Sequence, residues 1–383
     1  MSHLSYLEKL LDGEIVEWVA LGDVTLIKTG QAVSKQAIST NPGQYPVINS
    51  GREPLGFIDN WNTDNDPIGI TTRGAGVGSI TWQEGKYFRG NLNYSVTIKD
   101  SANLEVRYLY HLLHQMQSAI QSLCTFDGIP ALNAGSLKGL EIPIPCPNNP
   151  EKSLAIQSEI VRILDAFTAM TAELTAELNM RKKQHSHYQF ELLKFTETTQ
   201  QLSIGECCDI NKGATPIKKA TPGKYPLVAT TEERQSSSEY QFDCPAVCVP
   251  LISSRGHGVA SIDRIYYQDG KFALGNILCA ITPKDSEVLS AKFLRYYLFD
   301  KKDVLLVPLM RGGANVSLTM DSLKKVKIPI PPIADQQRIV RALDKFDEFV
   351  KALPREIELR QKQYEYYRDL LLSFPKSYSD EAA

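Results

Sequence analysis

Two glycine-rich stretches combine side chains that often contact nucleic acids. They are Thr71, Thr72 and Arg73 followed by Gly-Ala-Gly, and Ser253, Ser254 and Arg255 followed by Gly-His-Gly. Glycines let backbone N–H groups approach a ligand closely, and a guanidinium group can bind a phosphate or the edge of a guanine. We therefore predict a DNA contact at each stretch, although an ordinary glycine-rich turn between strands would show the same pattern.

Further polar side chains in both halves of the chain could add phosphate or base contacts. Lysine and arginine pair with phosphates, and an asparagine amide can pair with adenine. The candidates are Lys86, Arg89, Asn91 and Asn93 in the first half, and Lys218, Lys219, Lys271, Asn276 and Arg311 in the second.

The sequence carries no pattern typical of a catalytic or metal centre. It has no GxxxxGK[ST] phosphate loop, no HExxH motif, no paired-cysteine metal set and no Asn-Pro-Pro-aromatic motif of amino-methyltransferases. His111 and His114 are spaced to share one helix face, but we expect such an isolated pair to lie on the surface. We therefore expect no catalytic residue, no metal site and no cofactor of the chain's own.

Composition limits the partners of the chain. Its 42 Lys and Arg residues are balanced by 44 Asp and Glu residues, which gives a formal net charge of −2. A chain with a net charge this close to zero cannot bind DNA tightly through charge alone, so tight binding requires base contacts or a partner. No run of about 18 apolar residues and no signal peptide is visible, and the seven cysteines follow no regular framework. We expect no membrane association, and a cytoplasmic protein with reduced thiols.

The elements that must position the candidate residues occur twice. The motif Ile-Pro-Ile-Pro stands at 142–145 and again at 328–331. The segment 160–195 matches the segment 339–374 at a constant offset of 179 residues, without a gap. The sequence therefore predicts an internal duplication.

Each matched segment is predicted to form a long helix with a coiled-coil seam. Apolar side chains recur at alternating spacings of four and three residues between charged and amide side chains. One amphipathic helix of this length cannot bury its stripe alone, so we expect the two copies to pair antiparallel. The seam positions are Ile160, Leu164, Phe167, Leu174, Leu178, Tyr188 and Leu192 in the first helix, and Ile339, Leu343, Phe346, Val350, Ile357, Tyr364, Tyr367 and Leu371 in the second.

Some residues disturb this seam. Pro354 would either begin a fresh helix or kink the existing one. Arg181, His185 and Arg360 fall on the seam, where we expect their stems to pack and their polar ends to reach water. The alternative is that these polar groups fix the register of the pair.

Each long helix follows a globular region of short strands and turns. Residues 18–148 and 200–332 are rich in Gly, Pro, Asn, Tyr and β-branched runs, and helical periodicity appears only late, at 104–123 and 289–298. We therefore predict an α+β fold with two similar globular domains separated by two long antiparallel coiled-coil helices. The repeats are expected to be circularly arranged about a pseudo-two-fold axis.

The expected boundaries follow from this duplication. Tyr6 to Leu11 resembles Tyr367 to Leu372, so the N-terminal helix is assigned to the helical spine. The segments are an N-terminal helix at 1–17, a first globular domain at 18–150, a first long helix at 151–196, a second globular domain at 197–332, a second long helix at 333–375 and a tail at 376–383.

This arrangement resembles the specificity subunit of type I restriction–modification systems. The resemblance covers essentially the whole chain, and it rests on the order and spacing of motifs as well as on composition. The most telling pieces are L-N-A-G-S-L-K at 132–138, I-P-I-P at 142–145 and the segment 160–167, with counterparts at 318–324, 328–331 and 336–340, together with the segment 353–368.

The resemblance implies that each globular region is a target-recognition domain that reads one half of a bipartite site in double-stranded DNA. It also implies that the helices set the spacing of the half-sites and dock two methylation subunits, which restriction subunits join. S-adenosylmethionine, ATP and Mg²⁺ would belong to those partners, and this chain would be non-catalytic.

Two other functions stay open from the residues alone. A coiled-coil adaptor that no longer reads DNA would have the same fold, but it would tolerate Arg73→Ala and Arg255→Ala. A self-sufficient DNA enzyme would methylate DNA when supplied with S-adenosylmethionine and no other subunit.

Overall fold

A computed structural model describes residues 6–51, 53–231, 235–253, 260–312 and 316–376. The chain divides into two compact units. Unit 1 comprises Met1–Leu174 with Glu356–Ala383, and unit 2 comprises Thr175–Arg355. Each unit therefore joins one globular region to the first part of one long helix and the last part of the other.

The strands of unit 1 form two four-stranded sheets and two short ladders among the described residues. The first sheet has the order β2-β9-β6-β7 and is antiparallel, and the second has the order β4-β3-β8-β5, in which β3 and β8 run parallel. β1 pairs with β12, and β10 pairs with β11. The bounds are β1 Val16–Ala20, β2 Thr25–Thr29, β3 Pro42–Ile48, β4 Phe57–Ile58, β5 Thr63–Asp64, β6 Ile68–Thr71, β7 Ile80–Trp82, β8 Lys86–Arg89, β9 Asn93–Ile98, β10 Cys124–Thr125, β11 Ala131–Leu132 and β12 Glu141–Pro145.

Short helices connect these strands and carry the core of unit 1. They are α1 Tyr6–Leu11, α2 Leu21–Val24, α3 Lys35–Thr40, α4 Val106–Gln115, α5 Gln117–Ser122 and α6 Ala134–Lys138. Helix α4 buries Tyr108, Leu109, Leu112 and Leu113 in one hydrophobic cluster with residues of the long helices, among them Ile160. Burial of this apolar surface is the main force that fixes the globular region to the helices.

Unit 2 repeats the topology of unit 1. Its sheet β14-β22-β18-β20 matches β2-β9-β6-β7, and β16-β15-β21-β17 matches the second sheet, including the parallel pair β15 and β21. The bounds are β13 Gln201–Ser203, β14 Cys208–Lys212, β15 Tyr225–Val228, β16 Gln235–Ser237, β17 Phe242–Asp243, β18 Ala246–Pro250, β19 Ile252–Ser253, β20 Tyr266–Gln268, β21 Lys271–Leu274, β22 Leu278–Pro283, β23 Val316–Ser317 and β24 Lys327–Pro329. The predicted duplication of an α+β domain is therefore confirmed.

The shorter helices of unit 2 follow the same plan. They are α8 Ile204–Cys207, η1 Ile217–Lys219, η2 Ala260–Asp263, α9 Ala291–Asp300, α10 Lys302–Leu305, η3 Val307–Leu309 and α11 Met320–Lys324. Helix α9 buries Phe293 and Leu294 against Ile339 and Leu343 of the long helix α12, as α4 does in unit 1.

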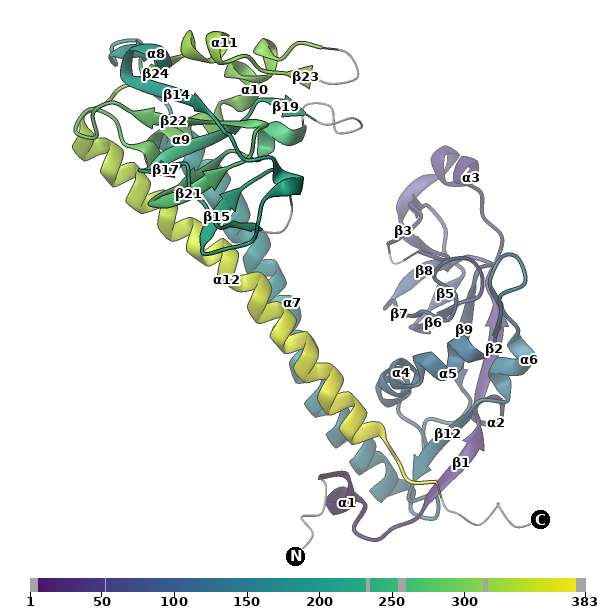
Figure 1. The fold of residues 1–383 in the computed structure, drawn as a ribbon. Helices are drawn as coiled ribbons and strands as arrows, with labels where there is room; N and C mark the ends of the chain where they lie inside the picture. The colour runs from purple at the N-terminus through teal and green to yellow at the C-terminus, as the bar shows by residue number, and fades with distance from the viewer. Residues whose placement is uncertain (1–5, 52, 232–234, 254–259, 313–315, 377–383) are drawn as a thin grey trace, which may run out of the picture. The chain divides into compact units, whose positions relative to one another are not determined.

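The matched segments form two long helices, α7 Pro150–Leu192 and α12 Ile333–Leu372 (Figure 1). In unit 2 they pair antiparallel: Arg181 lies 6.0 Å from the ring of Phe349, and Tyr188 stacks on Phe346 with centroids 5.2 Å apart. In unit 1, Phe167 stacks on Tyr367 at 5.1 Å. Helix α12 runs through Pro354 without interruption, so of the two alternatives for Pro354 the fresh helix start is wrong.

Only part of the predicted seam is buried. Ile160, Leu164, Leu178, Ile339, Leu343 and Leu371 are buried, whereas Leu174, Val350, Ile357 and Tyr364 are only partly buried and the stacked rings of Tyr188 and Tyr367 are exposed on one side. At the end of α7 it is Leu193, not the predicted Leu192, that is fully buried. A straight helix has 3.6 residues per turn, so its inner face drifts from a strict heptad pattern.

A buried glutamine fixes each globular region to its long helix. The side chain of Gln157 accepts from the N–H of Glu105 at 2.8 Å and donates to the carbonyl of Asn103 at 3.0 Å. Its repeat partner Gln336 makes the same two bonds, to Ser290 at 2.9 Å and to Val288 at 2.8 Å. Both side chains are fully buried, so these bonds set the depth at which each helix docks.

A polar cluster in each unit lies between α4 or α9 and the helix pair. In unit 1, His111 bonds to Asp165 at 2.8 Å through Nε2 and to the hydroxyl of Tyr364 at 3.0 Å through Nδ1. In unit 2, the hydroxyl of Tyr296 donates to Asp344 at 2.8 Å. The histidine of the first cluster is replaced by a tyrosine in the second, but both clusters centre on the same repeated aspartate.

Candidate nucleic-acid interface

Arg73 lies at the surface in a tight turn that follows β6. The turn is closed by bonds from the N–H of Val77 to the carbonyl of Gly74 at 3.0 Å and from the N–H of Gly78 to the carbonyl of Thr71 at 2.8 Å. Gly74 and Gly78 adopt positive φ angles of 94° and 77°, which L side chains rarely accept. The turn therefore fixes the backbone beside Arg73 and leaves its side chain exposed.

A hairpin lies next to this turn. The N–H of Gly74 donates to the carbonyl of Pro130 at 2.9 Å, and Arg73 forms a backbone bridge with Ala131. Between the strands β10 and β11, Phe126 and Ile129 are 63% and 68% exposed. Two large apolar side chains are thus exposed to solvent beside an exposed arginine. The sequence did not predict this arrangement because the hairpin carries no repeated motif.

Four of the predicted DNA contacts in unit 1 are buried, and the prediction is wrong for them. The side chains are Thr71, Thr72, Arg89 and Asn93, with exposed fractions between 0% and 8%. Strands β6, β8 and β9 carry Thr71, Arg89 and Asn93, and Thr72 follows β6, so all four side chains face the inside of the domain.

Arg89 carries most of this buried polar network. Its guanidinium donates to Asn93 Oδ1 at 2.6 Å, to the carbonyl of Ile68 at 3.1 Å and to the carbonyl of Asp66 at 2.7 Å, and it also contacts the hydroxyl of Tyr87. Burial lowers the pKa of Arg89 below its ordinary value. The arginine is therefore a structural residue of the first domain.

The other unit 1 candidates are accessible. Lys86 is exposed and its ammonium lies 4.5 Å from the ring centroid of Trp61, which is 43% exposed. Asn91 is exposed in the turn between β8 and β9. Together with Arg73 these side chains remain available to a ligand.

The structure changes the predicted equivalence of the two glycine-rich stretches. The N–H of Leu318 donates to the carbonyl of Leu251 at 2.8 Å, just as the N–H of Leu132 donates to that of Thr72 at 2.8 Å. Arg73 is therefore equivalent to Ile252, not to Arg255, and the second stretch begins one residue later with Ser253. Ser254 and Arg255 lie outside the described residues, as does the side chain of Ser253.

The remaining unit 2 candidates are all exposed. Lys218 and Lys219 lie on η1, Lys271 begins β21 with its ammonium 4.9 Å from the ring of Tyr240, and Asn276 follows that strand. Arg311 stands where Thr125 stands in unit 1, at the base of the hairpin, and its side chain donates to the carbonyl of Pro308 at 2.7 Å. Lys271 and Asn276 repeat Lys86 and Asn91 of unit 1, whereas Arg311 stands where unit 1 has Thr125, so the two units share some exposed candidates and differ at the hairpin.

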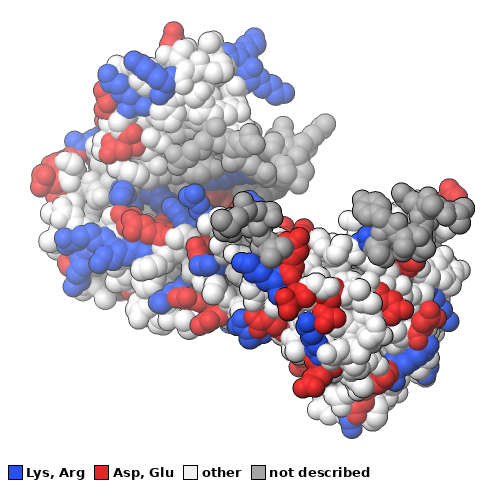
Figure 2. Space-filling model, turned by 90° about the horizontal axis from the view of Figure 1, so that it is seen from below, with Lys and Arg blue, Asp and Glu red and all other residues white. Residues whose placement is uncertain are grey.

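Charge is mixed over the surface. Figure 2 shows Lys and Arg side chains interspersed with Asp and Glu side chains on the face that it displays. This agrees with the net charge of −2 and favours recognition by shaped contacts over a broad electrostatic attraction.

His111 and five of the seven cysteines are buried. His111 is fully buried and His114 partly so, so the expected surface position is wrong for both, and burial lowers the pKa of His114 to about 4. The cysteines are free thiols, and burial raises the pKa of Cys279 to about 12. No group of three His, Cys, Asp or Glu residues that could hold a metal occurs among the residues described.

Comparison with known proteins identifies the scaffold. The family model of the type I restriction modification DNA specificity domain matches this chain twice, at residues 14–181 and 196–359. The chain belongs to the family of type I restriction–modification specificity subunits.

Curated relatives support this assignment over the full length. The chain is 35% identical to the EcoR124I/EcoR124II specificity subunit of Escherichia coli, with 98% of each chain covered. It is 32% identical to a putative type I restriction enzyme specificity subunit of Haemophilus influenzae, covering 97% of this chain and 98% of the relative. This type I specificity subunit therefore recognises DNA and is not itself catalytic.

Solved structures share the fold. The specificity subunit from M. genitalium superposes with a TM-score of 0.67 at 17% identity, covering 95% of this chain and 98% of that chain. Among the residues that the structure describes, no helix has the length and apolar character needed to cross a membrane.

Proposed function

We propose that the two globular regions of this specificity subunit read the two halves of a bipartite site in double-stranded DNA. The observation that carries the proposal is one sheet topology occurring twice with different exposed side chains at the equivalent hairpin. Unit 1 presents Arg73 beside the apolar tip of Phe126 and Ile129, whereas unit 2 presents Arg311 at the equivalent hairpin. A shared scaffold with divergent loops suits two readers of different sequences.

In this proposal the helix pair α7 and α12 sets the spacing of the half-sites and docks two methylation subunits. Restriction subunits join that core to form the cleaving complex. The partners bind S-adenosylmethionine, ATP and Mg²⁺, and this chain holds no cofactor and works in the cytoplasm. The near-neutral charge of the chain supports the need for partners, because few phosphate contacts can come from the subunit itself.

Methylome sequencing tests the proposal. Cells that express the cognate methylation subunits are compared with and without this chain. We expect a split motif, two short defined sequences around a fixed spacer, that is methylated only when the chain is present. A methylation pattern that does not change on deletion would contradict DNA recognition by this subunit.

A further inference from the structure

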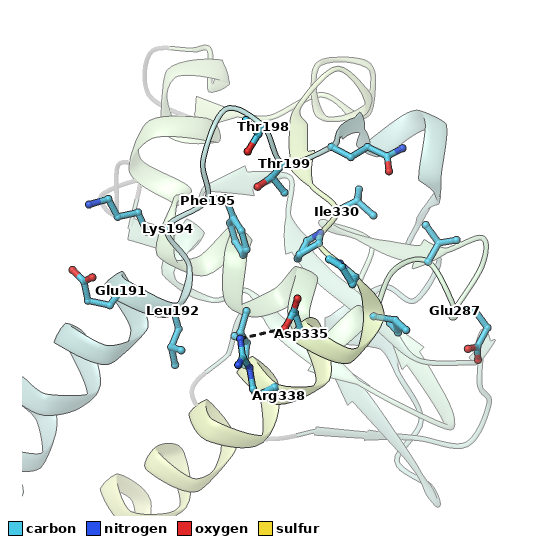
Figure 3. Close-up of a pocket in the computed structure, with 16 residues that line it drawn as sticks. Glu191, Leu192, Lys194, Phe195, Thr198, Thr199, Glu287, Ile330, Asp335 and Arg338 are labelled. Carbon is cyan, nitrogen blue, oxygen red and sulfur yellow. Dashed lines mark ion pairs between the residues drawn. The ribbon is translucent and has the colours of Figure 1, made fainter.

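A hollow of about 770 Å³ in unit 2 is lined by charges of both signs (Figure 3). The lining includes the carboxylates of Glu191, Glu287 and Asp335 together with Lys194 and Arg338. Arg338 is already paired with Asp335 at 3.2 Å. The hollow therefore favours no single class of ligand, whereas the hairpin between β10 and β11 in unit 1 does.

This hairpin ends in two apolar side chains, Phe126 and Ile129, which form its apolar tip. Residues 125–129 are all exposed, and the two side chains of the apolar tip are 63% and 68% exposed. Gly128 turns the chain between them with a positive φ of 95°. Large apolar side chains gathered on a projecting turn are typical of a surface that contacts another molecule.

The neighbours of the hairpin indicate which molecule that is. The N–H of Leu132 donates to the carbonyl of Thr72 at 2.8 Å, and the N–H of Thr72 donates to the carbonyl of Leu92 at 2.9 Å. The hairpin, the turn of Arg73 and the turn of Asn91 therefore lie side by side. Arg73 and Asn91 are exposed, and these side-chain types pair with guanine and adenine through their major-groove edges.

The major groove also offers a partner for the apolar tip. Its width admits a two-stranded β-ribbon, and among the four bases only thymine presents an apolar group there, the C5-methyl. Burial of this methyl group against phenylalanine and isoleucine side chains is favourable for both surfaces, because each loses contact with water.

The same hairpin of unit 2 has a different tip. Arg311 stands where Thr125 stands in unit 1, and both hairpins span the same number of residues between their bridged positions. Counted along the sequence from there, Gly312 and Asn315 take the places of the two apolar residues. A contact with a methyl group is therefore expected from unit 1 and not from the equivalent positions of unit 2.

We propose that the apolar tip contacts C5-methyl groups of thymine in the half-site that unit 1 reads. The base edges that suit Arg73 and Asn91 lie in the same groove as these methyl groups. The apolar tip thus makes unit 1 select A·T pairs at defined positions, because cytosine presents no methyl group. This inference rests on the proposed reading of one half-site by each unit.

Deoxyuridine, which is thymidine without the methyl group, tests the contact directly. The complete methylation complex is titrated into fluorescein-labelled duplexes that carry its split motif, with one thymidine at a time replaced by deoxyuridine. Fluorescence anisotropy measures the affinity. Exchange of residues 200–332 identifies the half-site of unit 1 as the part of the motif that stays the same. We expect at least one replacement there to weaken binding roughly fourfold, as the loss of one buried methyl group should.

The double variant Phe126→Ser with Ile129→Ser should bind the thymidine and deoxyuridine duplexes equally well. Replacements in the other half-site should affect the wild type and the double variant alike. The matched control is Leu26→Ser, at an exposed leucine of unit 1 that pairs with Thr97 toward the end of β9 remote from Arg73. This control should keep the fourfold difference.

Three outcomes contradict the inference: a unit 1 half-site without an A·T pair, no effect of any replacement there, or an equal effect in the wild type and the double variant. A double variant that binds the methylation subunit more weakly but keeps the thymidine preference would assign the apolar tip to that subunit instead. In each case the complex still binds a split motif, so these failures are distinct from a failure of DNA recognition itself.

Discussion

At the scale of single residues, two arginines of the first domain have different roles. Arg73 is exposed in a turn held by glycines, whereas Arg89 is buried and its two terminal amino groups donate to carbonyl and amide oxygens. The N–H donors of an exposed guanidinium can bind a ligand, whereas the terminal N–H donors of Arg89 already form hydrogen bonds within the domain. Substitutions at the two positions should therefore affect different properties.

The variant Arg73→Ala should weaken binding of the methylation complex to its DNA site about tenfold or more, because loss of a base-contacting arginine costs about 1–3 kcal/mol. Stability should not change, since the side chain is exposed. Fluorescence anisotropy with the cognate duplex measures the affinity, and thermal unfolding is the control. Wild-type affinity and site choice would show that this turn does not touch DNA.

Substitutions within the buried network of Arg89 should have coupled effects on the free energy of unfolding. Arg89→Ala leaves Asn93 and several carbonyls without a partner, so we expect a loss of about 3 kcal/mol in the free energy of unfolding. In unit 2 the equivalent positions hold Leu274 and Leu278, which are fully buried. The double variant Arg89→Leu with Asn93→Leu should recover part of the stability in urea titrations, and a further additive loss would refute the coupling.

At the scale of elements, the two buried glutamines should contribute strongly to the free energy of unfolding. Gln157→Leu leaves the N–H of Glu105 and the carbonyl of Asn103 unpaired in a buried site. The free energy of unfolding should therefore fall by about 2 kcal/mol. The three tryptophans, Trp18, Trp61 and Trp82, all lie in unit 1 and report its urea unfolding. The exposed Gln121→Leu serves as control, and equal effects in both variants would contradict the docking role.

Helix α4 makes unit 1 sensitive to acid. Burial, then the nearby charges of His111, Arg368 and Arg107, lower the pKa of His114 to about 4, below the value near 6.5 expected in the unfolded chain. The unfolded state thus binds the proton more readily, so stability is full above pH 6.5 and is lost as the pH falls toward 4. Between pH 7.5 and 5 we expect a loss of about 2 kcal/mol from this group.

Tryptophan fluorescence in urea at both pH values measures that loss. The variant His114→Phe keeps the ring contact with Tyr110 and should reduce the pH dependence, whereas His187→Gln, at an exposed histidine, should not. An unchanged pH dependence in His114→Phe would contradict a lowered pKa.

The long helices could be predicted from the sequence, but which side chains they and the strands bury could be predicted only in part. A gap-free repeat and heptad spacing predict α7 and α12, because periodicity and length are local properties. Arg89 and Asn93 look like surface residues until β3, β8 and β9 are placed around them, which no local pattern reveals. Arg73 and Arg255 align through a shared Arg-Gly-x-Gly-Val pattern, whereas the backbone pairing equates Arg73 with Ile252, so the sequence pattern misled the comparison.

At the scale of the whole molecule, duplication explains both the fold and the proposed function. Each globular region is fixed to the long helices by a buried glutamine, an apolar cluster and an aspartate-centred polar cluster. The repeats differ at the hairpin beside Arg73 in unit 1 and Arg311 in unit 2. Because the same attachment is repeated in both units, we expect that one globular region can be exchanged without changing the sequence that the other recognises.

Replacement of residues 200–332 by the corresponding domain of another specificity subunit tests this claim most directly, with the methylome as readout. We expect a new split motif in which one defined part changes while the other part and the spacer length stay the same. A motif in which both parts change together, or in which neither changes, would contradict two independent readers on one duplicated scaffold.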